Sequence, residues 1–161
     1  MSKLTANIII DAPPSEVWKS IGNVGEVHKW HPVVKTSPVL TDNATGIGAT
    51  RMCNFHDGTS VVEKVIAIDE GKSVTLELSE FSMPFNTAHG VVTLVELDGG
   101  RTRVEMDFEY TTKYGPVGWL MDAAMIRPMM TKMFDKVLGG LKHHVQTGDY
   151  IGEDGPVQQA A

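Results

Sequence analysis

The sequence predicts an α+β domain in which an antiparallel sheet packs against one long C-terminal helix. Segments with the two-residue alternation of strands are joined by short turns, which implies hairpins and therefore antiparallel pairing. Two short helical segments follow the first strand. From residue 115 to residue 147 the chain is helix-periodic and rich in methionine, and a helix of this kind buries one face against the sheet.

The strands are assigned from β-branched residues, alternation and turn signals. The first is rich in isoleucine, and Asp57-Gly58 is typical of a hairpin turn. Pro38 interrupts the second strand and favours an edge position for it. The last strand alternates most clearly, with Glu105, Asp107 and Glu109 on the face expected to meet solvent. Val104, Met106, Phe108 and Tyr110 form its other face, and the seven predicted strands are residues 3–11, 34–40, 49–55, 60–69, 74–80, 87–97 and 102–112.

The short helices are predicted at residues 15–21 and 24–30. Pro14 suits the start of the first, Gly22 ends it, and Pro32 stops the second.

The long helix carries apolar residues at spacings of three and four. Pro128 predicts a kink or a break, because proline removes a backbone donor and clashes with the preceding turn. Gly139-Gly140 either weakens the helix or lets its backbone pack closely. Methionine is flexible and polarisable, so these residues suit either an ordinary core or an adaptable cavity wall. The apolar positions are Val117, Leu120, Met121, Ala124, Met125, Met129, Met130, Phe134, Val137, Leu138, Leu141 and Val145.

Length, net charge and cysteine count exclude several types of partner and site. With 161 residues we expect one domain at residues 1–147, followed by a flexible tail at 148–161. A net charge of −6 with scattered Lys and Arg argues against a nucleic-acid partner. The single Cys53 excludes an intramolecular disulfide and a multi-cysteine zinc site. We expect a cytoplasmic monomer or homodimer with no signal peptide, membrane span, metal or cofactor.

Several short motifs together resemble a known superfamily. They are Ile10-Asp11-Ala12-Pro13-Pro14 with Val17-Trp18, Trp30-His31-Pro32, Gly48-Ala49-Thr50-Arg51, Val62-Glu63-Lys64-Val65 with Ile68-Asp69, Gly-Gly-Arg-Thr-Arg-Val at 99–104, and Gly140-Leu141-Lys142. Over residues 3–147 the chain resembles the START-like (Bet v 1-like, helix-grip) superfamily, especially its polyketide cyclase/dehydrase branch.

The resemblance implies a curved seven-stranded sheet wrapped around the long helix, with an internal cavity between them. Members bind lipids, sterols, plant hormones or aromatic polyketides, and some catalyse cyclisation or dehydration. The partner expected here is therefore a small hydrophobic molecule, and the fold alone does not choose between binding and catalysis.

Arg51 and Glu63 are the first candidate site residues. Each lies on a largely apolar strand face, adjacent hairpin strands bring the two faces together, and the resemblance turns them into the cavity. Because a buried charge needs a partner, the pair is a polar ligand anchor, an acid/base group or a structural ion pair. His31 is a further candidate general base. His28 lies at helical spacing from His31, but no third ligand for a metal is evident.

The resemblance also suggests which side chains line the cavity. Trp30 either packs in the core or lines the pocket, and Ala88 stands where related proteins often carry a bulky aromatic residue, so its small size favours a larger cavity. The apolar loop 82–85 suits an entrance or an interface. The complete set of predicted ligand-binding residues is Trp30, Arg51, Phe55, Glu63, Phe85, Ala88, Met106, Phe108, Met130 and Phe134.

Three functions follow from these observations. The first is a carrier or sensor of a small hydrophobic ligand. The second is a polyketide cyclase or dehydratase that uses Glu63, Arg51 or His31. The third is an interaction module that uses Met83-Pro84-Phe85. The sequence favours ligand binding over the other two functions, because it contains no firm acid/base dyad.

Overall fold

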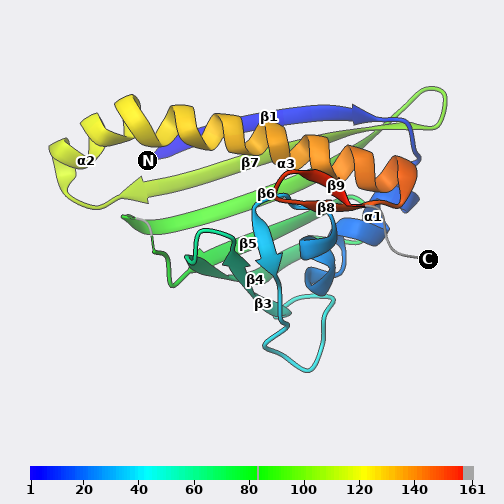
Figure 1. Cartoon of the computed structure of the whole chain (residues 1–161), viewed down its shortest axis with the longest axis horizontal. Helices are drawn as coiled ribbons and strands as arrows, with labels where there is room; N and C mark the ends of the chain where they lie inside the picture. The colour runs from blue at the N-terminus through cyan, green and yellow to red at the C-terminus, as the bar shows by residue number, and fades with distance from the viewer. Residues whose placement is uncertain (83, 158–161) are drawn as a thin grey trace.

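The protein consists of one curved antiparallel sheet crossed by a long helix. A computed structural model describes residues 1–82 and 84–157. The seven strands of its main sheet lie in the order β1-β7-β6-β5-β4-β3-β2 (Figure 1), which confirms the predicted fold class. The strands are β1 Ser2–Ile10, β2 Val34–Thr36, β3 Thr50–Phe55, β4 Ser60–Asp69, β5 Ser73–Ser79, β6 Phe85–Leu97 and β7 Arg101–Thr112.

The two short helices join the opposite edges of this sheet. They are α1, Pro14–Ile21, and the 3₁₀ helix η1, Val24–Lys29. Since β1 and β2 are the two edge strands, the chain has to cross the end of the sheet between them. The edge position predicted from Pro38 is therefore confirmed for β2.

The long helix is continuous but irregular. It comprises α2, Gly115–Met121, a π-helical turn η2, Asp122–Ile126, and α3, Arg127–Thr147. The π turn comes directly before Pro128, at the point where the sequence predicts an irregularity. None of the helices described by the structure is long and apolar enough to cross a membrane.

Two apolar clusters lie between the long helix and the sheet. The Trp30 cluster joins α1, η1 and the C-terminal half of α3, and includes Trp30, Val34, Cys53, Val61, Val104, Val137, Leu138 and Leu141. The aromatic cluster lies toward η2 and includes Leu4, Phe85, Ala88, Phe108, Tyr110, Ile126, Met130 and Phe134.

The predicted alternation of the last strand is confirmed on both faces of β7. Val104, Phe108 and Tyr110 are buried in the two clusters. Asp107, on the outer face, accepts a hydrogen bond from the hydroxyl of Thr5 at 2.6 Å and lies 3.6 Å from Lys3 Nζ.

The first half of the long helix differs from the prediction. Val117, Leu120, Met125 and Met129 were expected on its buried face, yet all four are exposed. The residues that turn inward are spaced four apart, at 118, 122, 126, 130 and 134. A step of four residues is longer than one α-helical turn of about 3.6 residues, so positions four apart gradually rotate around a regular α-helix. The π turn contains more residues per turn and therefore keeps these positions on the same side of the helix.

The segment after the long helix is also more ordered than predicted. Instead of a loose tail, Tyr150–Gly152 (β8) and Gly155–Val157 (β9) form a hairpin. Its Ile151 is buried, and α3 ends at Gly148, whose φ of 81° suits glycine. Strands of three residues are too short to give a periodic signal in the sequence. Residues 158–161 of the predicted tail lie outside the described residues.

Gly140 lets the backbone of the long helix approach the backbone at Trp30 closely. A Cβ atom at this position would lie 2.4 Å from the carbonyl oxygen of Trp30, whereas a Cβ at Gly139 would meet nothing within 4 Å. Of the two roles predicted for the glycine pair, close backbone packing therefore applies to Gly140.

These neighbouring glycines provide a matched test of that contact. Gly140→Ala should lower the free energy of unfolding by about 1–3 kcal/mol, because the added methyl group overpacks the contact. Gly139→Ala should raise it by up to about 1 kcal/mol through helix propensity alone. Urea unfolding of both variants measures the difference, and equal effects would contradict a specific role for Gly140.

Candidate functional site

The predicted Arg51–Glu63 pair is formed between neighbouring strands. The two residues lie directly opposite each other on β3 and β4. Arg51 Nε donates to Glu63 Oε2 at 2.6 Å, and Arg51 Nη1 donates to the carbonyl oxygen of Val24 at 3.0 Å. The side chain of Arg51 is 8% exposed and that of Glu63 is 15% exposed. The pair therefore ties η1 to the sheet, and Glu63 is its more accessible member.

Charge pairing outweighs burial at Glu63. Burial alone would raise the pKa of this carboxyl, but the Arg51 guanidinium holds the pKa below its ordinary value. The thiol of Cys53 lies 3.4 Å from Glu63 Oε2, and burial followed by the Glu63 charge raises the pKa of that thiol far above its usual range. Cys53 is therefore a neutral thiol and not an activated nucleophile.

His31 lies in the same electrostatic environment. Burial is the main cause that lowers the pKa of His31 to about 4, while Glu63 raises it and Arg51 lowers it further. The ring Nδ1 accepts a hydrogen bond from the backbone N–H of Val33 at 3.3 Å. A general base works best when its pKa is near the working pH, so this environment does not favour His31 in that role at neutral pH.

His28 does not pair with His31. Its Nδ1 lies 2.8 Å from the hydroxyl of Ser37 and 2.9 Å from the carbonyl oxygen of Gly25. Within residues 1–82 and 84–157, no three His, Cys, Asp or Glu side chains are grouped so as to hold a metal ion.

Trp30 is held by a hydrogen bond and by packing in the protein interior. Its indole Nε1 donates to the carbonyl oxygen of Ser20 at 3.0 Å, and its side chain is 8% exposed within the cluster named after it. Phe55 packs, partly buried, against the same cluster. Both residues therefore lie near the η1 end of the interior.

Five of the predicted ligand-binding residues meet in the aromatic cluster. The Phe108 and Phe134 rings contact edge to face at 5.5 Å between centroids, and Phe85 lies 5.0 Å from Tyr110. Phe85 was expected in an exposed loop, but it begins β6 and is only 4% exposed. Ser82 and Pro84 lie outside the strands as predicted, and Met83 lies outside the described residues. The prediction was wrong for Phe85, because an apolar residue after proline is compatible with a loop or with the start of a strand. The five residues are Phe85, Ala88, Phe108, Met130 and Phe134.

Between the two clusters lies a set of apolar side chains that both clusters share. Each is only partly buried, although Ala6 and Met106 face each other on the inner face of β1 and β7. Gly90 on β6 lies beside this set: a Cβ there would stand 3.8 Å from Phe108 and 4.0 Å from Leu78, which is ordinary contact. We call Ala6, Leu78, Phe81, Met106 and Met133 the central apolar set.

Of the central apolar set, only Met106 was predicted from the sequence. Leu78 is the member that connects the set to the ion pair, because Glu63 and Leu78 are register partners on β4 and β5. The same row crosses the rest of the sheet. In order it reads Arg51, Glu63, Leu78, Ala88, Tyr110 and Ser2.

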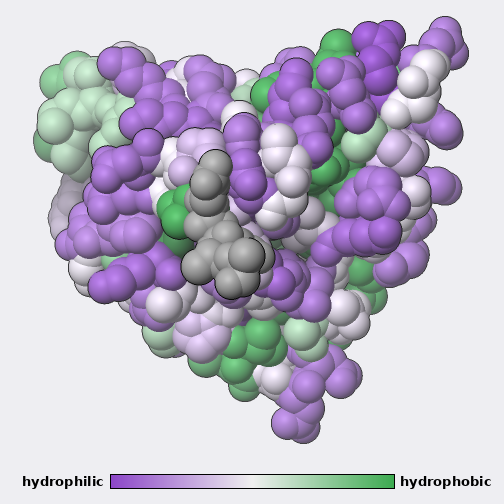
Figure 2. Space-filling model, turned by 45° about the vertical axis from the view of Figure 1, so that its right-hand side comes forward, coloured by the Kyte–Doolittle hydropathy of each residue, from purple (hydrophilic) through white to green (hydrophobic). Residues whose placement is uncertain are grey.

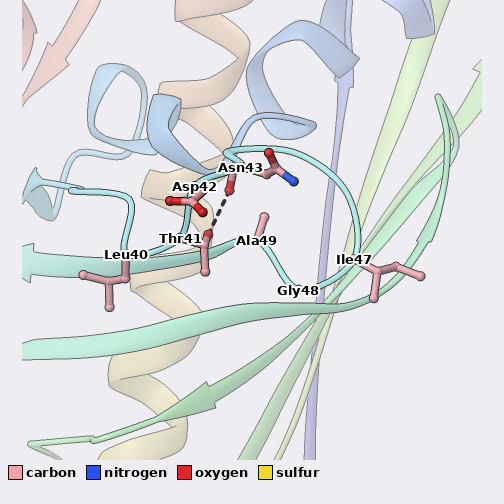
Figure 3. Close-up of a pocket in the computed structure, with 7 residues that line it drawn as sticks. All are labelled: Leu40, Thr41, Asp42, Asn43, Ile47, Gly48 and Ala49. Carbon is pink, nitrogen blue, oxygen red and sulfur yellow. Dashed lines mark hydrogen bonds between the residues drawn. The ribbon is translucent and has the colours of Figure 1, made fainter.

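Two solvent-open hollows are outlined by the described residues. One, of about 440 Å³, lies over the loop between β2 and β3, where the Thr41 hydroxyl donates to the carbonyl oxygen of Asn43 at 2.8 Å (Figure 3). It contains none of the predicted site residues. The other, of about 530 Å³, lies at the β5–β6 connection and is lined by Leu78, Phe81, Phe85 and Ala88 together with Glu77 and Lys113.

Comparison with known proteins agrees with this geometry. Over residues 1–146 the chain matches the family described as polyketide cyclase / dehydrase and lipid transport. The chain belongs to this family. The resemblance to the START-like superfamily is thereby confirmed. Proteins of curated function give no match.

Solved structures show the same fold at low sequence identity. XoxI from Bacillus cereus is 17% identical, with a TM-score of 0.74 over 91% of this chain and 97% of that one. Ara h 8.0201 is 16% identical, with a TM-score of 0.70 over 91% and 98%. The di-domain ARO/CYC protein BexL is 16% identical, with a TM-score of 0.71 over 91% of this chain and 47% of its own.

This member of the polyketide cyclase / dehydrase and lipid transport family has a second buried polar cluster, at Asp122 in the π turn. Its carboxylate accepts hydrogen bonds from the Tyr110 hydroxyl and, at 2.6 Å, from the Ser2 hydroxyl, and lies 3.6 Å from Arg127 Nη2. Burial and Asp122 together raise the pKa of Tyr110 to about 12. Burial alone would raise the pKa of Asp122, but the hydrogen bonds from Ser2 and Tyr110 hold it below its ordinary value.

The Asp122 cluster was not anticipated from the sequence. The available signal was a lone acidic residue within an apolar helical stretch, which has to find partners if it is buried. The Asp122 cluster fixes the start of the long helix to β1 and β7.

The half-buried, neutral His31 should make the protein less stable as the pH falls. Its pKa is about 4 in the folded chain and ordinarily 6.5, so between these values the unfolded chain binds a proton that the folded chain does not. Stability from this group is therefore present above the higher pKa and lost as the pH falls through the window. Protonation of Nδ1 would also remove the acceptor for Val33.

Urea unfolding of wild type and His31→Asn isolates this contribution. Between about pH 7 and about pH 5, wild type should lose on the order of 1–2 kcal/mol more than the variant, whose amide oxygen can still accept a hydrogen bond but does not titrate. Parallel pH profiles for the two proteins would show that His31 is not held neutral by the fold.

Proposed function

We propose that this protein binds a small hydrophobic molecule between the inner face of the sheet and α3. The observation that supports it is the central apolar set, whose members lie on or against the inner face between two packed clusters and yet stay only partly buried. Covering apolar surface stabilises a complex by about 25 cal/mol per Å². The family description, which includes lipid transport, agrees with such a ligand.

Glu63 is the proposed polar anchor for one end of the ligand. The hydrogen bonds and ion pair that the described residues make to this carboxylate all use Oε2, from Arg51 and Cys53. Oε1 is therefore the atom from which the carboxylate can accept a further bond. A ligand hydroxyl or amine beside Leu78 would lie one strand away from it. The ligand class we infer is an apolar molecule with a hydrogen-bond donor at one end.

The hollow at the β5–β6 connection is the proposed entrance. Its volume of about 530 Å³ is within the range of about 300–1,000 Å³ that is typical of small-molecule sites. Leu78 and Phe81 belong both to its lining and to the central apolar set, which supports an entrance at this position.

Gly90 gives a direct test of the ligand position. Gly90→Leu should place a side chain between Leu78 and Phe108, filling the space proposed for the ligand, while Val91→Phe adds the same number of heavy atoms on the opposite face of β6. Native mass spectrometry and solvent extraction of freshly purified wild type should reveal a bound hydrophobic molecule. Gly90→Leu should bind the extracted molecule, or anilinonaphthalene sulfonate as a probe, at least about tenfold more weakly, a loss of ~1.4 kcal/mol.

The control variant should retain wild-type affinity, and urea unfolding should show both variants folded. Equal affinity of wild type and Gly90→Leu would place the ligand elsewhere. A wild-type protein that carries no molecule and binds no probe would contradict the proposed function itself.

A polyketide cyclase or dehydratase activity is the second candidate. It is supported by the gathering of Arg51, Glu63 and His31 next to an apolar space, since folding a flexible chain for intramolecular attack requires a templating surface and a proton-transfer group. Glu63 is the best placed of the three, because it is ionised and more exposed than Arg51.

Replacement of Glu63 distinguishes an acid/base role from an anchor. If Glu63 transfers protons, Glu63→Gln should lower kcat on a polyketide-like substrate by about 10²–10⁴-fold and remove the acidic limb of the pH–rate profile. If it is an anchor, the change should appear in KM or in ligand affinity. Arg51→Met/Glu63→Met is the control for a purely structural pair, because it removes both charges without leaving one buried and unpaired.

Two further expectations from the sequence stay predictions. These are the monomeric or homodimeric state and the cytoplasmic location. A hydrophobic ligand requires neither a nucleic-acid partner nor a cofactor.

A further inference from the structure

The first half of the long helix presents a large apolar surface to solvent. The exposed fractions are 71% for Val117, 68% for Trp119, 62% for Leu120 and 67% for Met125. In Figure 2 hydrophobic colour covers the upper left corner of the molecule, at the end that α2 occupies in Figure 1, and further green areas lie at the upper right and at the bottom. We call Tyr114, Val117, Trp119, Leu120, Met125 and Met129 the α2 surface.

This exposure belongs to a helix that is firmly placed. A Cβ at Gly118 would lie 1.9 Å from the carbonyl oxygen of Lys113, so the start of α2 is packed tightly against its own preceding turn. One turn later, Asp122 is bonded to Tyr110 and Ser2. Because the fold buries Gly118 and the carboxylate, it turns the large apolar side chains outward. A contiguous exposed patch of this kind is characteristic of an interaction site.

The charges that flank the α2 surface have one sign. Lys113 comes before it, and Arg127 and Lys132 follow it. The carboxylate between them, Asp122, is buried and lies 3.6 Å from Arg127 Nη2, so it offsets the charge of Arg127 and leaves Lys113 and Lys132 as the exposed cations that flank the surface. The chain as a whole carries a net charge of −6, so this end of the molecule is a local exception.

We propose that the α2 surface docks on an anionic lipid bilayer, with α2 lying in the plane of the interface. Interfacial helices combine exposed Leu and Trp side chains with cations that contact anionic headgroups, and Tyr and Trp are enriched at headgroup depth. The flanking cations complement a negative surface. Two copies of the α2 surface facing each other would instead bring the same cations together with no exposed carboxylate between Lys113 and Lys132 to pair them. This inference is independent of any ligand in the interior.

Vesicle binding tests the proposal with variants at exposed positions. Wild type should co-sediment with vesicles of phosphatidylcholine and phosphatidylglycerol at least about tenfold better than with phosphatidylcholine alone, and added salt should weaken the binding. Leu120→Asp should reduce the partition coefficient at least about tenfold, because a charge replaces an inserted apolar side chain. Ile47→Asp is the matched control, since Ile47 is 71% exposed in the β2–β3 loop.

Charge variants make the second test. Lys132→Glu should weaken binding more than about fivefold, since each cation near an anionic surface contributes ~1 kcal/mol, whereas Lys35→Glu on β2 should change it little. Trp119 fluorescence should be quenched by brominated lipid in the anionic vesicles only.

Three outcomes overturn the proposal: no vesicle binding by folded wild type, equal losses in Leu120→Asp and Ile47→Asp, or a dimer in light scattering that Leu120→Asp dissociates without any vesicle binding. The last would identify a second copy of the chain as the occupant of the α2 surface.

Discussion

The attachment of the long helix to the inner face of the sheet is the constraint on which the rest of the structure depends. It is secured at both ends by contacts that tolerate little change. At one end Gly140 lets the helix backbone approach the carbonyl of Trp30, and at the other the Asp122 carboxylate is bonded to Tyr110 and Ser2. Between these two attachments, side chains of α3 and of the middle of the sheet pack against each other.

The middle of the sheet carries the central apolar set, whose side chains are only partly buried. Polar groups lie on both sides of this set. The row of register partners from Arg51 to Ser2 begins with an ion pair, passes Leu78 and Ala88, and ends at the Tyr110–Asp122 hydrogen bond. Both polar ends are buried charges with partners, which is the condition under which they are tolerated in an apolar interior. For the proposed ligand, Glu63 Oε1 is the acceptor at the ion-pair end of this row, because the bonds from Arg51 and Cys53 use Oε2.

The sequence predicted the sheet well because local signals and tertiary structure agree there. The alternation from Val104 to Tyr110 and the Asp57-Gly58 turn each specify pairing within a hairpin, and the Arg51–Glu63 contact follows from the same local register. Phe85 was misplaced because local sequence does not distinguish a loop from a strand start after Pro84. Gly90 and Leu78 were not identified as site residues, since their importance arises from neighbours on other strands.

The long helix shows a different limit of sequence reasoning. Its apolar residues recur at spacings that suit a continuous buried stripe, and periodicity alone places Val117, Leu120 and Met125 on that stripe. The structure buries positions at four-residue steps instead, because the π turn and the bonded Asp122 set the rotation of α2. The choice of Asp122 as the inward residue requires the apolar residues around it to point outward. The polar anchor of the helix and the exposed α2 surface are therefore two consequences of one rotation of α2.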